Sequence, residues 1–135
     1  MSHPLQEQLR TAVRALCADF GNDYWQAADE ERAYPHEFVD ALTEAGYLAC
    51  LIPEEYEGMG LGVCDACVIL EEINRSGASS GACHAQMYTM GTLLRHGSDE
   101  QKRRWLPGIA SGELRLQAFA VTEPDAGSDT TRIRT

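Results

Sequence analysis

The stretch GSDEQKRRWLPGIASGELRLQAFAVTEPDAGSD, residues 97–129, contains a helix start and then a change of hydrophobic period. Ser98 and Gln101 have the spacing of a capping box, in which each side chain binds the other residue's backbone N–H. The helix that follows has an apolar side, and Pro107 marks its end or a kink. The residues on that apolar side are Trp105, Leu106 and Ile109.

From Leu114 the period changes from helical spacing to simple alternation. Two sets of residues alternate, namely Leu114, Leu116, Ala118 and Ala120 with Arg115, Gln117, Phe119 and Val121. A period of two predicts one β-strand over residues 114–122. A single strand cannot pair its own backbone groups. We therefore expect a sheet to follow, and the chain to be an unfinished part of a larger protein.

Upstream of this stretch the chain has the spacing of amphipathic helices. About five helices are predicted, over residues 5–20, 35–46, 65–76, 79–96 and 98–110, and residues 23–34 form a loop or a short helix. Ser79 or Ser80 can cap the fourth of them. The fold class is therefore mainly α, with a helical domain over residues 1–113. Residues 114–135 are expected to begin a β-domain that this chain does not complete.

The stretch LIPEEYEGMGLG, residues 51–62, interrupts the helical pattern. Pro53 and three glycines at alternate positions are incompatible with a regular helix. Such glycines indicate a close backbone approach or a positive φ.

Composition excludes several classes of partner. The chain has 135 residues and a formal net charge of −10, so binding to nucleic acid or to an anionic membrane is not expected. The short basic run at residues 102–104 fits the solvated face of a helix. No apolar run is long enough to span a membrane, and Met1–Pro4 shows no signal peptide. The five cysteines fit reduced thiols in a cytoplasmic protein.

Metal and nucleophile motifs are weak. The pair Cys64 and Cys67, with Cys83 and His84 later in the chain, could suggest zinc. Adjacent helical residues point about 100° apart, and no second C-x-x-C is present, so we predict no metal site. The Ser-His-Asp, P-loop and G-x-G-x-x-G patterns are also missing from the sequence.

Three segments together resemble the acyl-CoA dehydrogenase family, and they cover most of the chain. They are GYL (46–48) leading into IPEEYEGMG (52–60), GSDEQK continuing to WLPGIASGE (97–113), and AVTEPDAGSD (120–129). The resemblance implies a flavoprotein with an N-terminal helical domain, a middle β-domain and a C-terminal helical bundle. It also implies noncovalently bound FAD, a tetramer in the full-length protein, and electron-transfer flavoprotein or another electron acceptor.

The implied reaction, in fatty acid metabolism, is α,β-dehydrogenation of an acyl-CoA thioester. A carboxylate removes the α proton, and the β hydrogen leaves as hydride to flavin N5. The resemblance places that carboxylate in the C-terminal domain, so no catalytic residue is predicted in this chain, and the chain alone is expected to be inactive and to bind FAD poorly. Glu123 is instead expected to fix its turn by accepting backbone N–H bonds.

The resemblance also implies contact residues. Phe119, Val121 and Thr122 match positions along the flavin, and Ser128 matches a position near the flavin pyrophosphate and the CoA part of the substrate. The alternative for Ser128 is an ordinary turn after a strand. Met87 and Met90 lie on the helix that borders the acyl pocket in the family, so they are candidate substrate contacts, the alternative being ordinary core.

Two other functions stay open at this point. The chain could be a noncatalytic helical interaction module that pairs with a partner supplying the β-domain. It could also belong to a relative with altered chemistry, namely a flavin oxidase, a monooxygenase or a carrier-protein-linked dehydrogenase.

Overall fold

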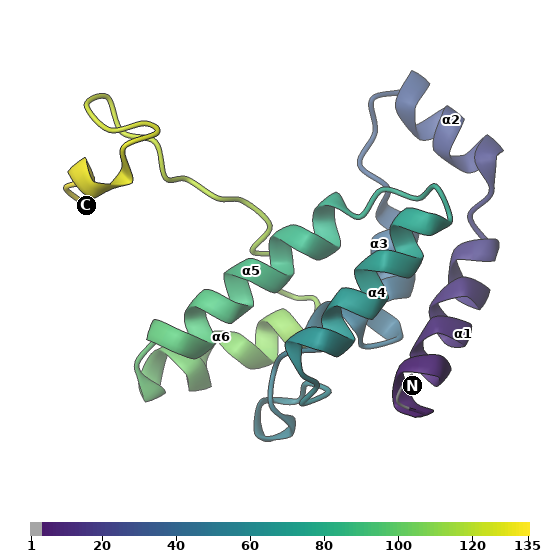
Figure 1. Cartoon of the computed structure of the whole chain (residues 1–135), viewed down its shortest axis with the longest axis horizontal. Helices are drawn as coiled ribbons and strands as arrows, with labels where there is room; N and C mark the ends of the chain where they lie inside the picture. Colours follow the sequence, from purple (N-terminus) through teal and green to yellow (C-terminus); the bar gives the residue numbers. More distant parts are fainter. Residues whose placement is uncertain (1–3) are drawn as a thin grey trace.

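The computed structural model describes residues 4–135, which form a helical body followed by an extended C-terminal stretch (Figure 1). The described residues contain six α-helices, as follows: α1 (Pro4–Ala18), α2 (Asn22–Glu30), α3 (His36–Glu44), α4 (Val63–Arg75), α5 (Gly81–His96) and α6 (Asp99–Ser111). Three 3-10 turns accompany them, η1 (Tyr47–Ala49), η2 (Glu54–Tyr56) and η3 (Thr130–Arg132). The mainly helical prediction is confirmed, and the segment left open between a loop and a short helix contains all of α2 but its first residue. Met1–His3, on which the signal-peptide argument rests, lie outside the described residues.

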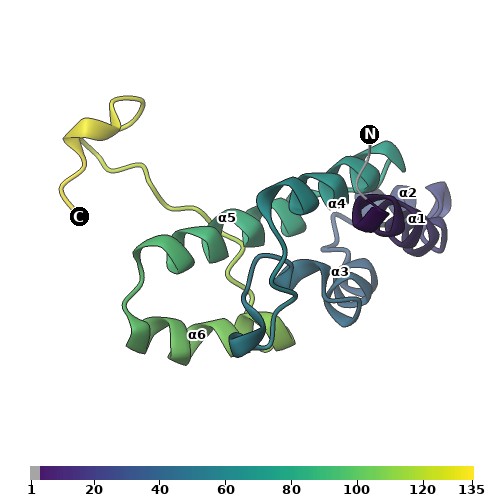
Figure 2. The same ribbon diagram turned by 60° about the horizontal axis from the view of Figure 1, so that its bottom comes forward.

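The hydrophobic core lies where α3, α4, α5, α6 and η1 meet, and α1 adds its buried side to it through α4. Helix α1 packs against α4 at one side of the body, and α5 lies beside α6 at the other (Figure 2). The largest apolar side chains with no exposed surface are Phe38, Leu42, Leu48, Ile52, Ile69, Ile73, Met90, Leu106 and Ile109. These side chains lie between residues 38 and 109 of the sequence, so the core joins the elements of that range into one unit.

A buried carboxylate joins α1 to α4. Glu72 on α4 has no exposed surface, and Arg14 and Arg10 on α1 both donate hydrogen bonds to it. The distance from Arg10 Nη1 to Glu72 Oε1 is 2.8 Å, and that from Arg14 Nη2 to the same oxygen is 2.9 Å. Hydrogen bonds from Arg14 and then Arg10 lower the pKa of Glu72 to about 2, although burial alone would raise it.

The glycine-rich turn between η1 and α4 behaves as the sequence predicts. Gly60 has a φ of 63°, in the left-handed region that favours glycine. A Cβ on Gly58 would lie 2.1 Å from the Ile52 carbonyl oxygen, so only glycine fits there without a shift of the backbone. The two glycines therefore serve the two purposes expected of them.

Helix boundaries agree with the sequence in some places and differ in others. The capping box of α6 is present, with Ser98 N–H donating to Gln101 Oε1 at 2.8 Å and Gln101 N–H to Ser98 Oγ at 3.2 Å. Helix α6 does not end at Pro107 but continues to Ser111. Ser80 occupies the N-cap position of α5, yet its side chain makes no capping bond and donates to Asn74 instead.

The predicted strand over residues 114–122 is wrong as a paired element. Residues 4–135 contain no β-strand, and the sole β-bridge recorded among them joins Glu123 to Ala126. The segment runs as an extended chain away from α6 (Figure 1). Side chains do alternate between two faces of this segment. Within the described residues no neighbouring strand forms a ladder with it, and side chains on α3 and α5 bind it instead.

Candidate functional site

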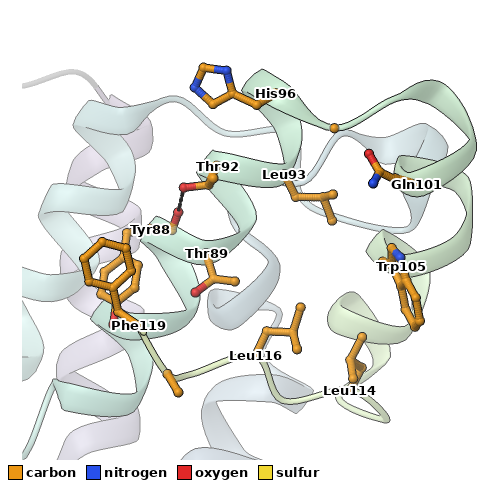
Figure 3. Close-up of a pocket in the computed structure, with 12 residues that line it drawn as sticks. Tyr88, Thr89, Thr92, Leu93, His96, Gln101, Trp105, Leu114, Leu116 and Phe119 are labelled. Atoms are coloured by element: carbon orange, nitrogen blue, oxygen red, sulfur yellow. Dashed lines mark hydrogen bonds between the residues drawn. The ribbon is translucent and has the colours of Figure 1, made fainter. Parts of the chain in front are cut away.

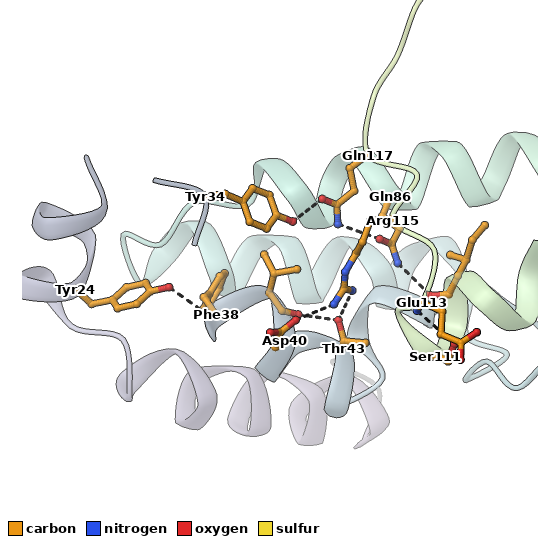
Figure 4. A network of polar contacts seen from close by, with 12 residues as sticks. Tyr24, Tyr34, Phe38, Asp40, Thr43, Gln86, Ser111, Glu113, Arg115 and Gln117 are labelled. Carbon is orange, nitrogen blue, oxygen red and sulfur yellow. Dashed lines mark hydrogen bonds and ion pairs between the residues drawn. The ribbon is translucent and has the colours of Figure 1, made fainter. Parts of the chain in front are cut away.

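The segment after α6 is fixed to the helical body by polar side chains at alternate positions. Arg115 Nη2 donates to Asp40 Oδ1 at 2.9 Å, and its Nη1 donates to the hydroxyl of Thr43 (Figure 4). Gln117 Nε2 donates to Gln86 Oε1 at 3.0 Å. The first half of the predicted strand therefore has a fixed place along α3 and α5.

The apolar residues of the same segment line a groove beside α5 and α6 (Figure 3). Its volume is about 650 Å³. The lining residues are largely apolar and come from three places, α5, α6 and the segment 114–119: Tyr88, Thr89, Thr92, Leu93, His96, Gly97, Gln101, Trp105, Leu114, Leu116, Ala118 and Phe119. A groove of this size and character suits a mostly apolar ligand or an apolar protein surface.

Helix α5 presents a different face to this groove from the one that the sequence singled out. Met87 and Met90 are buried in the core, with 5% and 0% of their surface exposed, and neither lines the groove. The structure thus places them as the core alternative describes. Tyr88, Thr92 and His96 line the groove in their place, and His84 stacks edge-to-face on Tyr88 with ring centroids 5.3 Å apart.

Sequence reasoning missed this second stripe, although a signal for it exists. Residues 84, 88, 92 and 96 are spaced by four and carry polar or amphipathic side chains, which places them on one helix face. Met87 and Met90 form the more apolar of the two stripes. A more apolar stripe on a helix usually faces the core, and that is where Met87 and Met90 lie.

The candidate flavin contacts lie at the outer end of the segment. Phe119 is 70% exposed and packs edge-to-face on Tyr88, with centroids 5.4 Å apart. Val121 is half-buried and Thr122 is exposed. Within residues 4–135, the backbone groups of 118–122 make no hydrogen bond. Free backbone donors and acceptors, a free hydroxyl and an exposed ring are therefore gathered over four residues.

The turn after this segment is built around Glu123. Its carboxylate accepts the backbone N–H groups of Arg134 and Thr135, each at 3.0 Å, and also the Thr135 hydroxyl. These bonds, that of the Thr135 hydroxyl first, lower the pKa of Glu123. Glu123 accepts backbone N–H bonds as expected, but these bonds tie the turn to Arg134 and Thr135 and do not close the turn itself. Ser128 lies exposed in the same turn, away from the groove-lining residues.

The five cysteines divide into a buried and an exposed group. Cys17, Cys50 and Cys83 are buried, whereas Cys64 and Cys67 are exposed. Burial raises the pKa of the Cys50 thiol to about 12 and also raises the pKa of Cys83, so both stay protonated at neutral pH. Among residues 4–135, no group of three or more metal-ligating side chains comes together. No helix in that range is both long and apolar enough to cross a membrane.

Comparison with known proteins gives a consistent result. A family model described as the N-terminal domain of acyl-CoA dehydrogenase matches residues 3–113. The chain is 36% identical over 131 residues to acyl-CoA dehydrogenase FadE12 of Mycobacterium tuberculosis (strain ATCC 25618 / H37Rv), which covers 96% of this chain and 34% of that protein. It is 38% identical over 131 residues to glutaryl-CoA dehydrogenase of Desulfococcus multivorans, covering 93% and 32%. The chain thus spans about a third of the length of these curated relatives.

Solved structures have the same helical arrangement. The structure of a glutaryl-coenzyme A dehydrogenase in complex with glutaryl-CoA matches with a TM-score of 0.84 and 31% identity, covering 98% of this chain and 35% of that one. An acyl-CoA dehydrogenase from Geobacillus kaustophilus also gives a TM-score of 0.84, at 28% identity, with the same coverage.

Proposed function

The chain belongs to the acyl-CoA dehydrogenase family, and from this we propose that it forms the helical wall of a flavin-dependent enzyme that desaturates an acyl-CoA thioester. Because its relatives are about three times longer, the activity proposed here is that of an intact protein containing residues 1–135. Residues 1–113 form its N-terminal helical domain, and residues 114–135 begin its β-domain.

The observation that carries this proposal is the set of free groups at Phe119–Thr122. The backbone groups of this segment make no hydrogen bonds within the described residues, and Thr122 exposes its hydroxyl. The polar edge of an isoalloxazine ring needs such donors and acceptors, and an aromatic side chain can pack against the ring. The residues present therefore fit FAD, with Phe119, Val121 and Thr122 as its contacts.

The chemistry needs an acceptor for two electrons and a base. A bound FAD supplies the hydride acceptor. The chain's own residues position and enclose the reactants, since α5 and the segment 114–119 form an apolar wall that excludes water from the acyl chain. Glu123 is not the base, because three hydrogen bonds hold its carboxylate and lower its pKa. We place the base in the C-terminal domain of the intact protein, as the family resemblance implies.

The exposed turn at Gly127 and Ser128 supports a second contact. Both residues are exposed, so a backbone N–H or a hydroxyl there can bind an anion such as a pyrophosphate. We assign Ser128 to the flavin pyrophosphate or to the CoA part of the substrate. Substrate contacts from α5 come from its groove face, at Tyr88 and Thr92, and not from the buried Met87 and Met90.

Assembly and electron transfer complete the proposal. The intact protein forms a homotetramer, as the family resemblance implies, and passes its electrons to electron-transfer flavoprotein or to another acceptor. Oxygen consumption during turnover distinguishes a dehydrogenase from the related flavin oxidases, because an oxidase uses oxygen directly.

The test is the affinity of the intact protein for FAD. Thr122→Ala removes one hydroxyl, and the loss of one hydrogen bond is expected to weaken FAD binding by about fivefold. Phe119→Ala removes the packing ring and is expected to weaken it further. The matched control is Thr11→Ala on the exposed face of α1, which should bind FAD as the unchanged protein does. Equal affinities in all four proteins would contradict the assignment of these contacts.

A further inference from the structure

We propose that Gln86 is a positioning residue, which fixes the register of the segment 114–119 along α5 and thereby the place of Phe119. The part of this inference that concerns flavin rests on the proposed function, because Phe119 is a flavin contact only if that function holds. The part that concerns register rests on the contacts of Gln86 alone.

Gln86 is a polar side chain in an otherwise apolar part of the core. It has no exposed surface and lies on α5 directly before the buried Met87. Its Nε2 donates to the Leu48 carbonyl oxygen at 3.1 Å and to that of Ile109 at 3.4 Å. Burying an amide is costly unless its groups are bonded. Here the amide binds η1 and the last turns of α6 at once, so its own position is fixed.

The acceptor end of the same amide points to the segment. Gln86 Oε1 accepts from Gln117 Nε2 at 3.0 Å, and Gln117 Oε1 in turn accepts from the Tyr34 hydroxyl (Figure 4). The donors therefore all point in one direction, from Tyr34 through Gln117 and Gln86 to the two carbonyls. Bonds in such a chain polarise and strengthen one another. Gln117 is the one member that belongs to the segment.

Register is what this chain of bonds can specify. Over residues 114–118, Leu114, Leu116 and Ala118 line the groove, whereas Arg115 and Gln117 bind the helices. Phe119 also lines the groove, so the alternation ends there. A slip by one residue would exchange the two sets and bring polar side chains into the groove. In a sheet the ladder of a neighbouring strand resists such a slip, but residues 114–122 have none. Arg115 reaches two exposed or half-buried groups at the surface, and Gln86 provides the fixed point within the core.

The experiment measures how often the segment opens in the 135-residue chain. Trypsin cleaves after Arg115 only when its guanidinium leaves Asp40 and Thr43, so the cleavage rate there follows the open population. Gln117→Ala is expected to raise that rate about fivefold, the effect of one lost hydrogen bond. Magnetisation transfer between the rings of Tyr88 and Phe119, measured by NMR, should weaken in the same variant, since the rings are in contact only in the native register.

Two further variants make the result specific. Gln86→Leu keeps the core filled but removes the fixed point, so it should raise cleavage at least as much as Gln117→Ala. If Gln86 acts through Gln117, trypsin should cleave the protein that carries both Gln86→Leu and Gln117→Ala no faster than the protein with Gln86→Leu alone. The matched control is Gln26→Ala. The Gln26 amide binds Glu30 on the surface of α2, so its loss should leave the rate of cleavage after Arg115 unchanged.

The outcomes separate this inference from the proposed function. Wild-type cleavage and an intact ring contact in Gln117→Ala would overturn the register role, and this holds even if Gln86→Leu fails to fold. A loosened segment together with weaker FAD binding in the intact Gln117→Ala protein supports both proposals. If the intact Gln117→Ala protein is also cleaved faster after Arg115 but keeps its FAD affinity, the register role is supported and the contact of Phe119 with flavin is overturned.

Discussion

Glu72 is buried without exposed surface, and two arginines from a distant helix supply its hydrogen bonds. Its pKa is about 2 in the folded chain, against an ordinary value near 4.3 in an unfolded one. Because the folded pKa is the lower one, the stabilisation is fully present above the unfolded value. It is lost as the pH falls from about 4.5 toward 2.

The corresponding prediction is a loss of stability in this acid window. Urea unfolding at several pH values should show a lower midpoint as the pH falls from 4.5 toward 2. Glu72→Gln should lower the midpoint at pH 7, because the arginines lose a charged partner, and it should flatten the acid dependence. Glu71→Gln is the control, since Glu71 is exposed and its ion pair is with Arg10. An equally steep acid dependence in Glu72→Gln would show that other carboxylates dominate.

The role of Glu72 could not be predicted from the sequence. The spacing of Ala66, Ile69 and Ile73 predicts the buried face of α4, but Glu72 is adjacent to that face and its partners lie about 60 residues away. Glu123 is the opposite case. A carboxylate in a turn commonly accepts backbone N–H bonds, so that use of Glu123 was predictable, but its donors, Arg134 and Thr135, lie 11 and 12 residues further along the chain and were not.

At the scale of one element, the N-terminus of α6 offers a direct test of capping. Ser98→Ala should cost about 1 kcal/mol of stability, because Ser98 Oγ accepts the Gln101 N–H. Ser80→Ala at the N-cap position of α5 should cost only a few tenths of a kcal/mol of stability, since Ser80 makes no capping bond. Chemical denaturation of the two variants gives the comparison. Equal losses of stability in the two variants would mean that the hydrogen bond between Ser98 and Gln101 does not stabilise α6.

The spacing of apolar residues predicted the helices well, but it wrongly predicted a paired strand over residues 114–122. Helical spacing depends on contacts within each helix and with the core, and both are present in this chain. The alternation over residues 114–122 has the period of a strand, but a strand also requires a partner. Arg115 and Gln117 show another origin for the same period, namely one row of side chains bound to helices and one row lining a groove.

At the scale of the whole molecule, one side of the helical body carries the candidate site. The groove, the exposed ring of Phe119 and the free backbone groups of 118–122 all lie along α5 and the C-terminal segment. Helices α1 and α2 lie at the other side of the body (Figure 1). Sequence motifs located the segment but not the face of α5 that accompanies it, because helical spacing alone does not tell which of two stripes is buried.

The measurement that tests the central claim most directly is the absorption spectrum of the flavin in the intact protein during anaerobic titration with acyl-CoA thioesters. Our account predicts one FAD for each copy of residues 1–135 and loss of the visible band of oxidised flavin with at least one saturated acyl-CoA. The matching 2-enoyl-CoA should appear in equal amount, since one hydride and one proton leave each substrate molecule. An intact protein that retains no flavin, or whose flavin spectrum no acyl-CoA changes, would contradict the account.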